Sequence, residues 1–311
     1  MSSEYNHKDL LGMRDLSKGE IFCFLNKAKE FKELNNSDIK KCKDLHGQTV
    51  INAFFENSTR TRVSFETAAK RLSADAINFS SSSSSTKKGE TLIDTIQNME
   101  AMKADIFAIR HPNAGAPHMV AKNTESAIVN AGDGANEHPT QALLDLFTIL
   151  EHKKTLEGLT VSIIGDILHS RVARSNIWAM NTLGMNVKLY GPNTMMPIYS
   201  DIFNCTICNS IEEAIEGSDV VIMMRIQLER QSQTLVPSMR EYSKFFGLNK
   251  QRISLANKNA LVLHPGPINR GVELNSDVAD SDCSVILNQV ENGVAIRMAV
   301  LSILSKNKRG L

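Results

Sequence analysis

The chain has 311 residues, enough for two domains of ordinary size. Lys and Arg together number 35 and Asp and Glu 34, so the net charge of +1 gives no overall argument for binding nucleic acid or an anionic membrane. The N-terminal sequence has no apolar segment typical of a secretory signal, and no apolar run is long enough to cross a bilayer. We therefore expect a soluble, cytoplasmic protein that contacts neither nucleic acid nor membrane.

The five cysteines are scattered, and their odd number argues against a disulfide framework. Cys205 and Cys208 form one C-x-x-C pair, without the further ligands that a structural zinc site needs. A redox pair or half of a metal site is the functional alternative. We favour two small side chains on or beside a strand, and we expect neither a metal nor an organic cofactor.

Helix and strand patterns alternate along the first half of the chain. Ser17 to Glu20 has the residues of a capping box, which predicts a helix running to about Leu34. Further elements are expected as strands at 48–55, 76–80, 105–110 and 126–132, and as helices at 61–74 and 91–102.

The alternation begins again in the second half, with strands expected at 160–166, 186–191, 219–224 and 261–265, and helices at 171–184 and 211–217. Strands that alternate with helices predict parallel sheets, so we expect an α/β protein with two domains, each a parallel sheet flanked by helices. The domains are predicted at residues 1–140 and 150–290, joined by bridging helices. One is expected at 138–154 and one from about 283 to 305, with residues 291–311 packing back on the first domain.

Ser58-Thr59-Arg60-Thr61-Arg62 lies where the first predicted strand ends and a helix begins. A helix N-terminus offers unpaired backbone N–H groups, and a guanidinium adds a planar fork suited to phosphate oxygens. A capped helix with surface arginines would look the same, so the motif alone leaves the two interpretations about even. The Walker pattern is absent.

Further polar residues follow other predicted strands. Arg110 ends a predicted strand, and open parallel sheets bind ligands at the carboxyl ends of their strands. His138 and Gln141 lie three residues apart, on one face of a predicted helix. A His donor can polarise a carbonyl and a Gln amide can hold an –NH₂ group, although an exposed strand end and a solvated helix start are the bland alternatives.

The second half lacks the G-x-G-x-x-G that a dinucleotide site would need. Arg171 instead begins a predicted helix, and Arg225 and Gln227 follow a strand at a spacing that lets both reach one ligand. Pro265 and Gly266 follow the last strand, in a rigid segment whose backbone carbonyls could accept from an amide.

The order and spacing of these motifs resemble the transcarbamoylase superfamily from about Asp9 to the C-terminal helix. The motifs are S-T-R-T-R (58–62), S-x-x-x-K-G-E-x-x-x-D-T (84–95), R-H-P (110–112), H-P-T-Q (138–141), R-x-x-R-S (171–175), R-x-Q (225–227) and H-P-G-P (264–267). The first and fourth are the most specific to the superfamily.

The resemblance implies that the first domain binds carbamoyl phosphate and the second binds L-aspartate. It assigns the binding of the phosphate to Ser58, Thr59, Arg60 and Thr61, and the binding of the carbamoyl carbonyl to Arg110 and His138. The carbamoyl –NH₂ group would be bound by Gln141 and by the backbone carbonyls of Pro265 and Gly266. The aspartate would be bound by Arg171, Arg225 and Gln227. Arg60, Thr61, Lys88, Arg110 and His138 would act in catalysis.

The resemblance also implies assembly. Ser84 and Lys88, in and after a run of serines, would reach into a neighbouring subunit's site, and Glu56 would pair with arginines of the second domain when the domains close. The implied protein is a homotrimer with shared sites that makes N-carbamoyl-L-aspartate, the committed step of pyrimidine synthesis. Binding of regulatory chains or of a dihydroorotase stays open.

An ornithine-specific carbamoyltransferase is the nearest alternative. That branch carries Cys-Leu-Pro after the histidine, whereas this chain has H-P-G-P, and Arg171 and Arg225 suit a dicarboxylate better than a diamino acid. A non-catalytic binding subunit is a third alternative, which we would expect to lack Lys88, Arg110 or His138.

Overall fold

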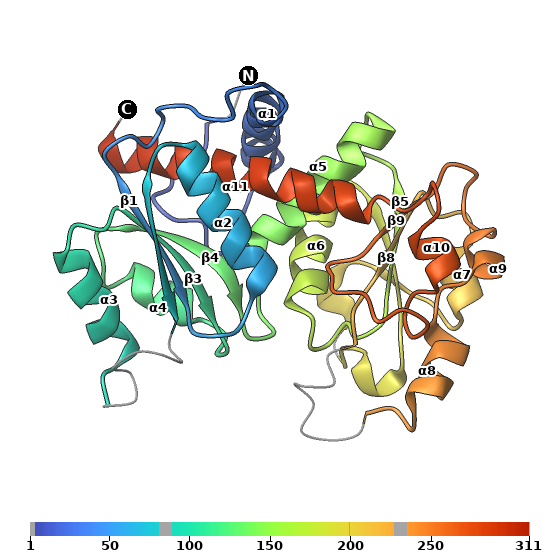
Figure 1. Ribbon diagram of the computed structural model, residues 1–311. Helices are drawn as coiled ribbons and strands as arrows, with labels where there is room; N and C mark the ends of the chain where they lie inside the picture. The colour runs from blue at the N-terminus through green and yellow to red at the C-terminus, as the bar shows by residue number, and fades with distance from the viewer. Residues whose placement is uncertain (1–3, 81–88, 199, 227–234, 311) are drawn as a thin grey trace. The chain divides into compact units, whose positions relative to one another are not determined.

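The computed structural model describes residues 4–80, 89–198, 200–226 and 235–310. The chain divides into two compact units: unit 1 comprises Met1–Phe147 and Glu291–Leu311, and unit 2 comprises Thr148–Val290. Two helices, α5 (Pro139–Lys153) and α11 (Ile286–Arg309), have residues in both units. Each unit contains one parallel sheet flanked by helices, so the predicted α/β class is confirmed (Figure 1).

The sheet of unit 1 has the strand order β2-β1-β3-β4, and every neighbouring pair is parallel. Its strands are β1 (Thr49–Phe54), β2 (Asp75–Ser80), β3 (Ile106–His111) and β4 (Ala127–Asp133). The helices that accompany them are α1 (Lys18–Asn35), α2 (Thr59–Arg71), α3 (Leu92–Ala101) and α4 (Ala116–Ala121). Parallel pairing places the carboxyl ends of all four strands at one edge of the sheet.

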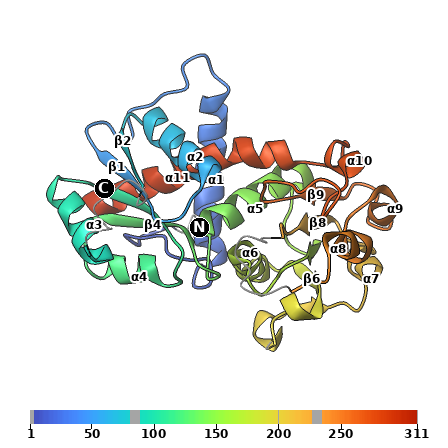
Figure 2. The same ribbon diagram turned by 60° about the horizontal axis from the view of Figure 1, so that its bottom comes forward.

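One face of this sheet packs against α3 and α4. Ile96 of α3 and Val120 of α4 contact apolar residues of the strands, namely Ile51, Ala53, Phe107, Ile109 and Ile128. The strand residues alternate along each chain, as the period of two in a β-strand requires. Figure 2 shows α2 on the other face, where Phe65 is fully buried.

The sheet of unit 2 has the order β7-β6-β5-β8-β9 and is also parallel throughout. Its strands are β5 (Thr160–Ile164), β6 (Asn186–Tyr190), β7 (Thr206–Ile207), β8 (Val220–Met223) and β9 (Leu261–Leu263). Its helices are α6 (Arg171–Thr182), α7 (Ile211–Ile215), α8 (Met239–Phe246), α9 (Lys250–Ile253) and α10 (Ser276–Ala279), with 3-10 turns at Asn193–Met195 and Ser200–Phe203.

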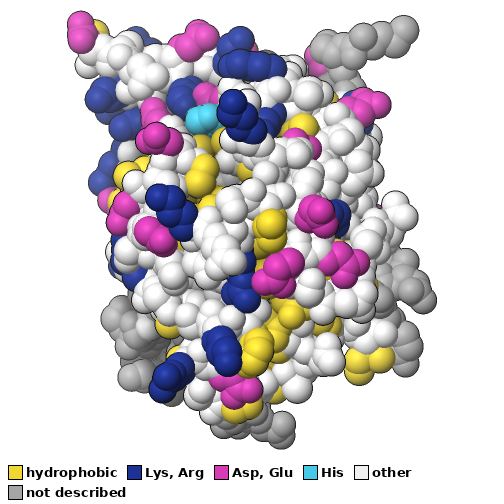
Figure 3. All heavy atoms as spheres, turned by 90° about the vertical axis from the view of Figure 1, so that its right-hand side faces the viewer, with side chains coloured by type: hydrophobic (Ala, Val, Ile, Leu, Met, Phe, Trp, Pro, Cys, Tyr) yellow, Lys and Arg dark blue, Asp and Glu magenta, His cyan; other side chains and the backbone are white. Residues whose placement is uncertain are grey.

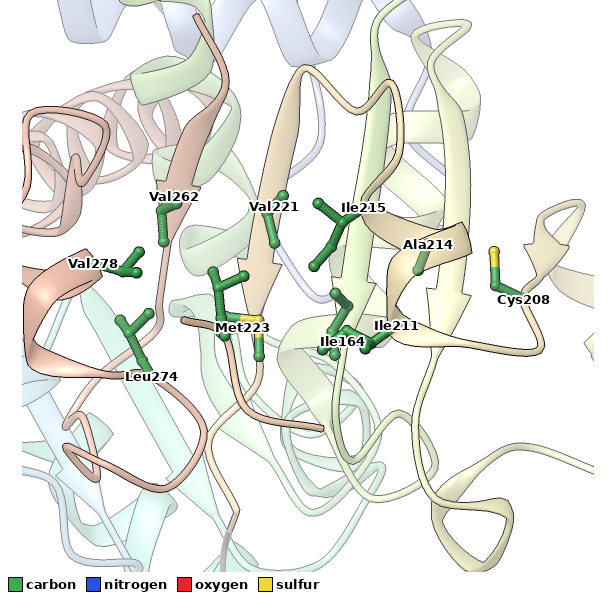
Figure 4. Close-up of a cluster of buried hydrophobic side chains, with 11 residues drawn as sticks. Ile164, Cys208, Ile211, Ala214, Ile215, Val221, Met223, Val262, Leu274 and Val278 are labelled. Atoms are coloured by element: carbon green, nitrogen blue, oxygen red, sulfur yellow. The ribbon is translucent and has the colours of Figure 1, made fainter. Parts of the chain in front are cut away.

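The core of unit 2 forms where α7 and α10 cover the central strands. Figure 4 shows Ile215 of α7 beside Val221 of β8 and Ile211 of α7 beside Ile164 of β5, with Val278 of α10 near Val262 of β9. Burial of such side chains contributes about 25 cal/mol for each Å² of apolar surface removed from water. This packing holds the strand ends in fixed register.

Several predicted boundaries were wrong. Helix α2 begins at Thr59, two residues before the predicted start, because Ser58 is extended (φ −161°, ψ 110°) and serves as the N-cap. The C-terminal helix begins at Ile286 rather than Cys283, since backbone hydrogen bonds join Val262 to Cys283 and Val285 and hold those residues in extended chain. It then continues to Arg309.

The cysteines are all free, and Cys205 and Cys208 flank the short edge strand β7, as the bland interpretation predicted. Burial raises the pKa of both thiols, for Cys205 to about 11, so neither is a reactive thiolate at neutral pH. None of the helices in the described ranges is long and apolar enough to cross a membrane. On the face in Figure 3, basic and acidic side chains are interspersed, in keeping with the near-zero net charge.

Candidate functional site

The predicted site residues of unit 1 follow the carboxyl ends of neighbouring strands. Ser58 to Thr61 come after β1, Arg110 is the second-last residue of β3, and His138 follows β4. Phe54 of β1 is in register with Arg110 of β3, so these two segments lie side by side. Open parallel sheets bind ligands at this edge, which makes it the candidate site of unit 1.

The start of helix α2 lacks a side-chain capping bond that most other helix starts in the described chain have, although Asn275 of α10 and Gly115 of α4 also lack one. Ser17, Thr91, Ser170 and Ser210 each accept a hydrogen bond from a backbone N–H in the first turn of their own helix. Ser58 is also an N-cap but makes no such side-chain bond. The side chains of Thr59 and Arg60 are exposed, and Thr61 is half-buried. Where the N-cap side chain makes no such bond, the backbone N–H groups of the first turn remain available to bind an anion.

This difference predicts unequal effects on stability. Ser17→Ala should lower the free energy of unfolding by about 1 kcal/mol, because it removes half of a capping box. Ser58→Ala removes no capping bond and should change it by less than about 0.5 kcal/mol, within the ordinary range for surface substitutions. Urea denaturation followed by circular dichroism gives both values. An equal loss at the two positions would show that the Ser58 hydroxyl is structural.

Arg110 is held in place by Glu56 and by the backbone of β4. Its Nε lies 3.3 Å from Glu56 Oε2, and its Nη1 donates to the carbonyl of Ala131 at 3.4 Å. Both side chains of the ion pair are less than a fifth exposed, at 11% and 18%. Burial lowers the pKa of the neighbouring His111, which is therefore neutral at pH 7 and adds no second positive charge beside Arg110.

His138 is buried, immediately before the first residue of α5, and the loop that leads to it is fixed by Asp133. The Asp133 carboxylate accepts from the backbone N–H groups of Gly115 (2.7 Å) and Glu137 (3.0 Å) and from Asn130 Nδ2 (2.8 Å). A fully buried carboxylate with several donors is a rigid anchor. The loops after β3 and β4 are thereby tied to one another.

Unit 2 shows the same placement at the ends of adjacent strands. Arg171, 4% exposed, is the first residue of α6 after β5, and Arg225 follows the neighbouring strand β8. Pro265 and Gly266 follow β9, the next strand in the sheet. Two guanidinium groups in the segments that follow adjacent strands are suited to a ligand with two carboxylates.

His264 fixes the turn that carries Pro265 and Gly266. Its Nδ1 accepts from the Gly266 N–H at 2.8 Å, so the ring proton belongs on Nε2, which donates to Glu273 Oε1 at 3.1 Å. Both His264 and Glu273 are buried. Glu273 also accepts from the backbone N–H of Asn269 at 2.7 Å, which closes the turn.

Three predicted residues, Ser84, Lys88 and Gln227, lie outside the described residues. Within the described ranges, no group of three His, Cys, Asp or Glu side chains could hold a metal ion. Sequence reasoning missed the buried charged residues that support the site, namely Asp133, Asp145, Glu273 and Arg297. Asp145 and Arg297 carried a signal, because each interrupts the apolar side of an otherwise well-patterned helix.

Two family models cover most of the chain. Residues 8–151 match the aspartate/ornithine carbamoyltransferase carbamoyl-P binding domain, and residues 157–304 match the Asp/Orn binding domain. The chain belongs to the aspartate/ornithine carbamoyltransferase family.

Among its relatives, the aspartate carbamoyltransferase catalytic subunit of Campylobacter curvus is 66% identical over 98% of this chain and 99% of the relative. That of Geobacter sulfurreducens is 57% identical over 96% of each. The aspartate transcarbamoylase of Trypanosoma cruzi, solved with carbamoyl phosphate and aspartate, has a TM-score of 0.87 at 28% identity, covering 97% of this chain and 99% of that one. The ornithine carbamoyltransferase of Pyrococcus furiosus has a TM-score of 0.85 at 29% identity, covering 95% and 96%.

Proposed function

We propose that this chain transfers the carbamoyl group of carbamoyl phosphate to the α-amino group of L-aspartate, which gives N-carbamoyl-L-aspartate and phosphate and commits carbon to pyrimidine synthesis. Relatives named aspartate carbamoyltransferase catalytic subunit are 54–66% identical to this chain along nearly its whole length. The observation that carries the proposal within the structure is the pair Arg171, the first residue of the helix after β5, and Arg225, which follows the adjacent strand β8.

Unit 1 supplies what carbamoyl phosphate requires. The start of α2, with Ser58, Thr59, Arg60 and Thr61, would bind the phosphate through backbone N–H groups, hydroxyls and one guanidinium. Arg110 and His138, at the ends of β3 and β4, would bind the carbamoyl oxygen. Gln141 would bind the carbamoyl –NH₂ group.

The reaction needs orientation and charge stabilisation. The aspartate α-amino nitrogen attacks the carbamoyl carbon, and negative charge develops on the carbamoyl oxygen before the bond to phosphate breaks. Arg110, His138 and the Thr61 hydroxyl would stabilise that oxygen, and Arg60 with Lys88 would stabilise the leaving phosphate. Positioning the two substrates lowers the barrier further.

Unit 2 favours aspartate over ornithine. Arg171 and Arg225 would each bind one carboxylate, with Gln227 assisting, and Pro265 and Gly266 would offer backbone carbonyls to the carbamoyl –NH₂ group. Gly266 stands in H-P-G-P, without the cysteine expected of the ornithine branch. A side-chain ammonium would meet two positive charges, which is unfavourable without a compensating carboxylate.

A colorimetric ureido assay tests this choice. With carbamoyl phosphate present, purified protein should produce carbamoyl-aspartate from L-aspartate and give no signal above background with L-ornithine. D-aspartate is the matched control, because it carries the same charges in the wrong stereochemical arrangement. A signal with ornithine but not with aspartate would show that the protein is an ornithine carbamoyltransferase. If neither amino acid gives a signal in protein that still binds carbamoyl phosphate, a non-catalytic binding subunit is favoured.

The proposal extends to assembly. We expect a homotrimer in which Ser84 and Lys88 of one subunit complete the phosphate site of the next, in the cytoplasmic location expected from the sequence. The relatives are named catalytic subunits, which leaves room for regulatory chains, or for a dihydroorotase, as further partners.

A further inference from the structure

Gln141 is attached to a buried carboxylate one helical turn away. Its Nε2 donates to Asp145 Oδ1 at 2.9 Å, and both residues lie on α5 within unit 1. Gln141 is 9% exposed and Asp145 is fully buried. A hydrogen bond closed off from water in this way is stronger than the same contact on the surface.

Asp145 lies in the electrostatic field of a buried arginine. Arg297 of α11 is 4% exposed, its Nη1 donates to Ser64 Oγ (3.0 Å) and the Gly293 carbonyl (2.9 Å), and its guanidinium lies 5.1 Å from the centre of the Phe65 ring. Burial lowers the pKa of Arg297 to about 10, while the charge of Asp145 opposes this change. Arg297 therefore stays positive at neutral pH and needs the anion.

The charge on Asp145 makes the Gln141 amide directional. An ionised carboxylate only accepts hydrogen bonds, so the –NH₂ end of the amide must face Asp145. The carbonyl oxygen Oε1 is the end that faces away. An amide fixed in this orientation can accept a hydrogen bond from a ligand, and it cannot offer Nε2 to a ligand carbonyl without losing Asp145.

We infer that Asp145 is a positioning residue for substrate selection: it holds the Gln141 amide with its oxygen toward the ligand, so that the site selects an acyl phosphate with an –NH₂ group over one with a methyl group. This inference rests on the proposed function, which places carbamoyl phosphate in unit 1. The same contacts reach the phosphate-binding helix, because Ser64 lies in α2 one turn beyond Thr61.

The test compares carbamoyl phosphate with acetyl phosphate, which carries a methyl in place of the –NH₂ group. Equilibrium dissociation constants for both, and for inorganic phosphate, are measured by calorimetry on the wild type and on Asp145→Asn. The asparagine keeps the shape of the side chain, but its own –NH₂ end lets the Gln141 amide turn over. We expect the preference for carbamoyl phosphate to fall about tenfold, the worth of one buried hydrogen bond, with phosphate affinity little changed.

A double-mutant cycle separates positioning from simple stability. Gln141→Met should remove the same preference, and adding Asp145→Asn to it should change the preference no further if Asp145 acts through Gln141. Asp105→Asn is the matched control: its carboxylate accepts from the Thr49 N–H at 2.9 Å at the amino ends of β1 and β3, and it should leave the preference unchanged. If Asp145→Asn does not fold, the neutral pair Asp145→Asn with Arg297→Met replaces it.

Three outcomes decide the matter. A selective loss of preference in Asp145→Asn supports the inference. Equal weakening of carbamoyl phosphate and acetyl phosphate would mean that Asp145 is only structural, which overturns it. A wild type with no preference for carbamoyl phosphate would overturn the proposed function itself, and the two failures are thereby distinguishable.

Discussion

Arg60→Ala is expected to reduce turnover nearly to background in a protein that still folds. Arg60 lies in the first turn of α2 with an exposed side chain, so its removal takes no packing from the core. Losing a charge-assisted contact to a desolvated phosphate costs on the order of 2–5 kcal/mol, or about 30-fold to about 5,000-fold in rate. Initial rates with saturating aspartate measure the loss.

Arg71→Ala is the matched control, because Arg71 is the last residue of the same helix. It should cost a few tenths of a kcal/mol of stability at most, through the helix dipole, and leave turnover unchanged. Near-normal activity in folded Arg60→Ala would show that the phosphate does not bind at the start of α2. Equal losses in both variants would point to a general effect of charge on this helix.

Mixing two inactive variants is expected to restore activity. Lys88→Ala and Arg60→Ala should each be almost inactive, since each would remove a positive charge from the proposed phosphate site. If neighbouring subunits share that site, a trimer assembled from both variants contains an interface with native Arg60 on one side and native Lys88 on the other. Only one of three interfaces in a mixed trimer can be intact, so activity should return to at most about a third of the wild-type value.

The measurement requires unfolding and reassembling the two variants together, with native mass spectrometry to confirm that mixed trimers form. Each variant reassembled alone is the control and should stay inactive. If mixed trimers form and remain as inactive as their parents, Lys88 does not complete a neighbour's site.

The sequence was most informative where apolar patterning and motif position agree. All strands except the two-residue β7, and the helices that begin at Pro139 and Arg171, were predicted to within two residues, whereas the end of α2 was placed three residues too late. Helices α4, α8, α9 and α10 were missed. The first has only six residues and the last two only four each, and α8 follows a polar stretch without a strand pattern to frame it.

The supporting contacts could not be predicted, because they join residues far apart in the chain. Arg297 and Ser64 are separated by 233 positions, and Glu56 is paired with Arg110 through the register of two strands. Glu56 had been expected to pair with arginines of the second domain, and that pairing stays a prediction. The motifs predicted which residues face the ligands, and that assignment stays a prediction, whereas the contacts that hold those residues are visible only in the fold.

Unit 1 is assembled from both ends of the polypeptide, whereas unit 2 is one uninterrupted segment. The end of α11 is fastened to the beginning of the chain, where Ser302 donates to Asp44 Oδ2 (2.7 Å), Ser305 to Gln48 Oε1 (2.7 Å) and Asn307 to the His7 carbonyl (2.9 Å). During synthesis unit 2 can therefore finish folding before unit 1, although most of unit 1 is made earlier, because unit 1 also needs the last turns of α11. Premature termination within those turns would therefore damage unit 1, most of which is encoded at the opposite end of the sequence.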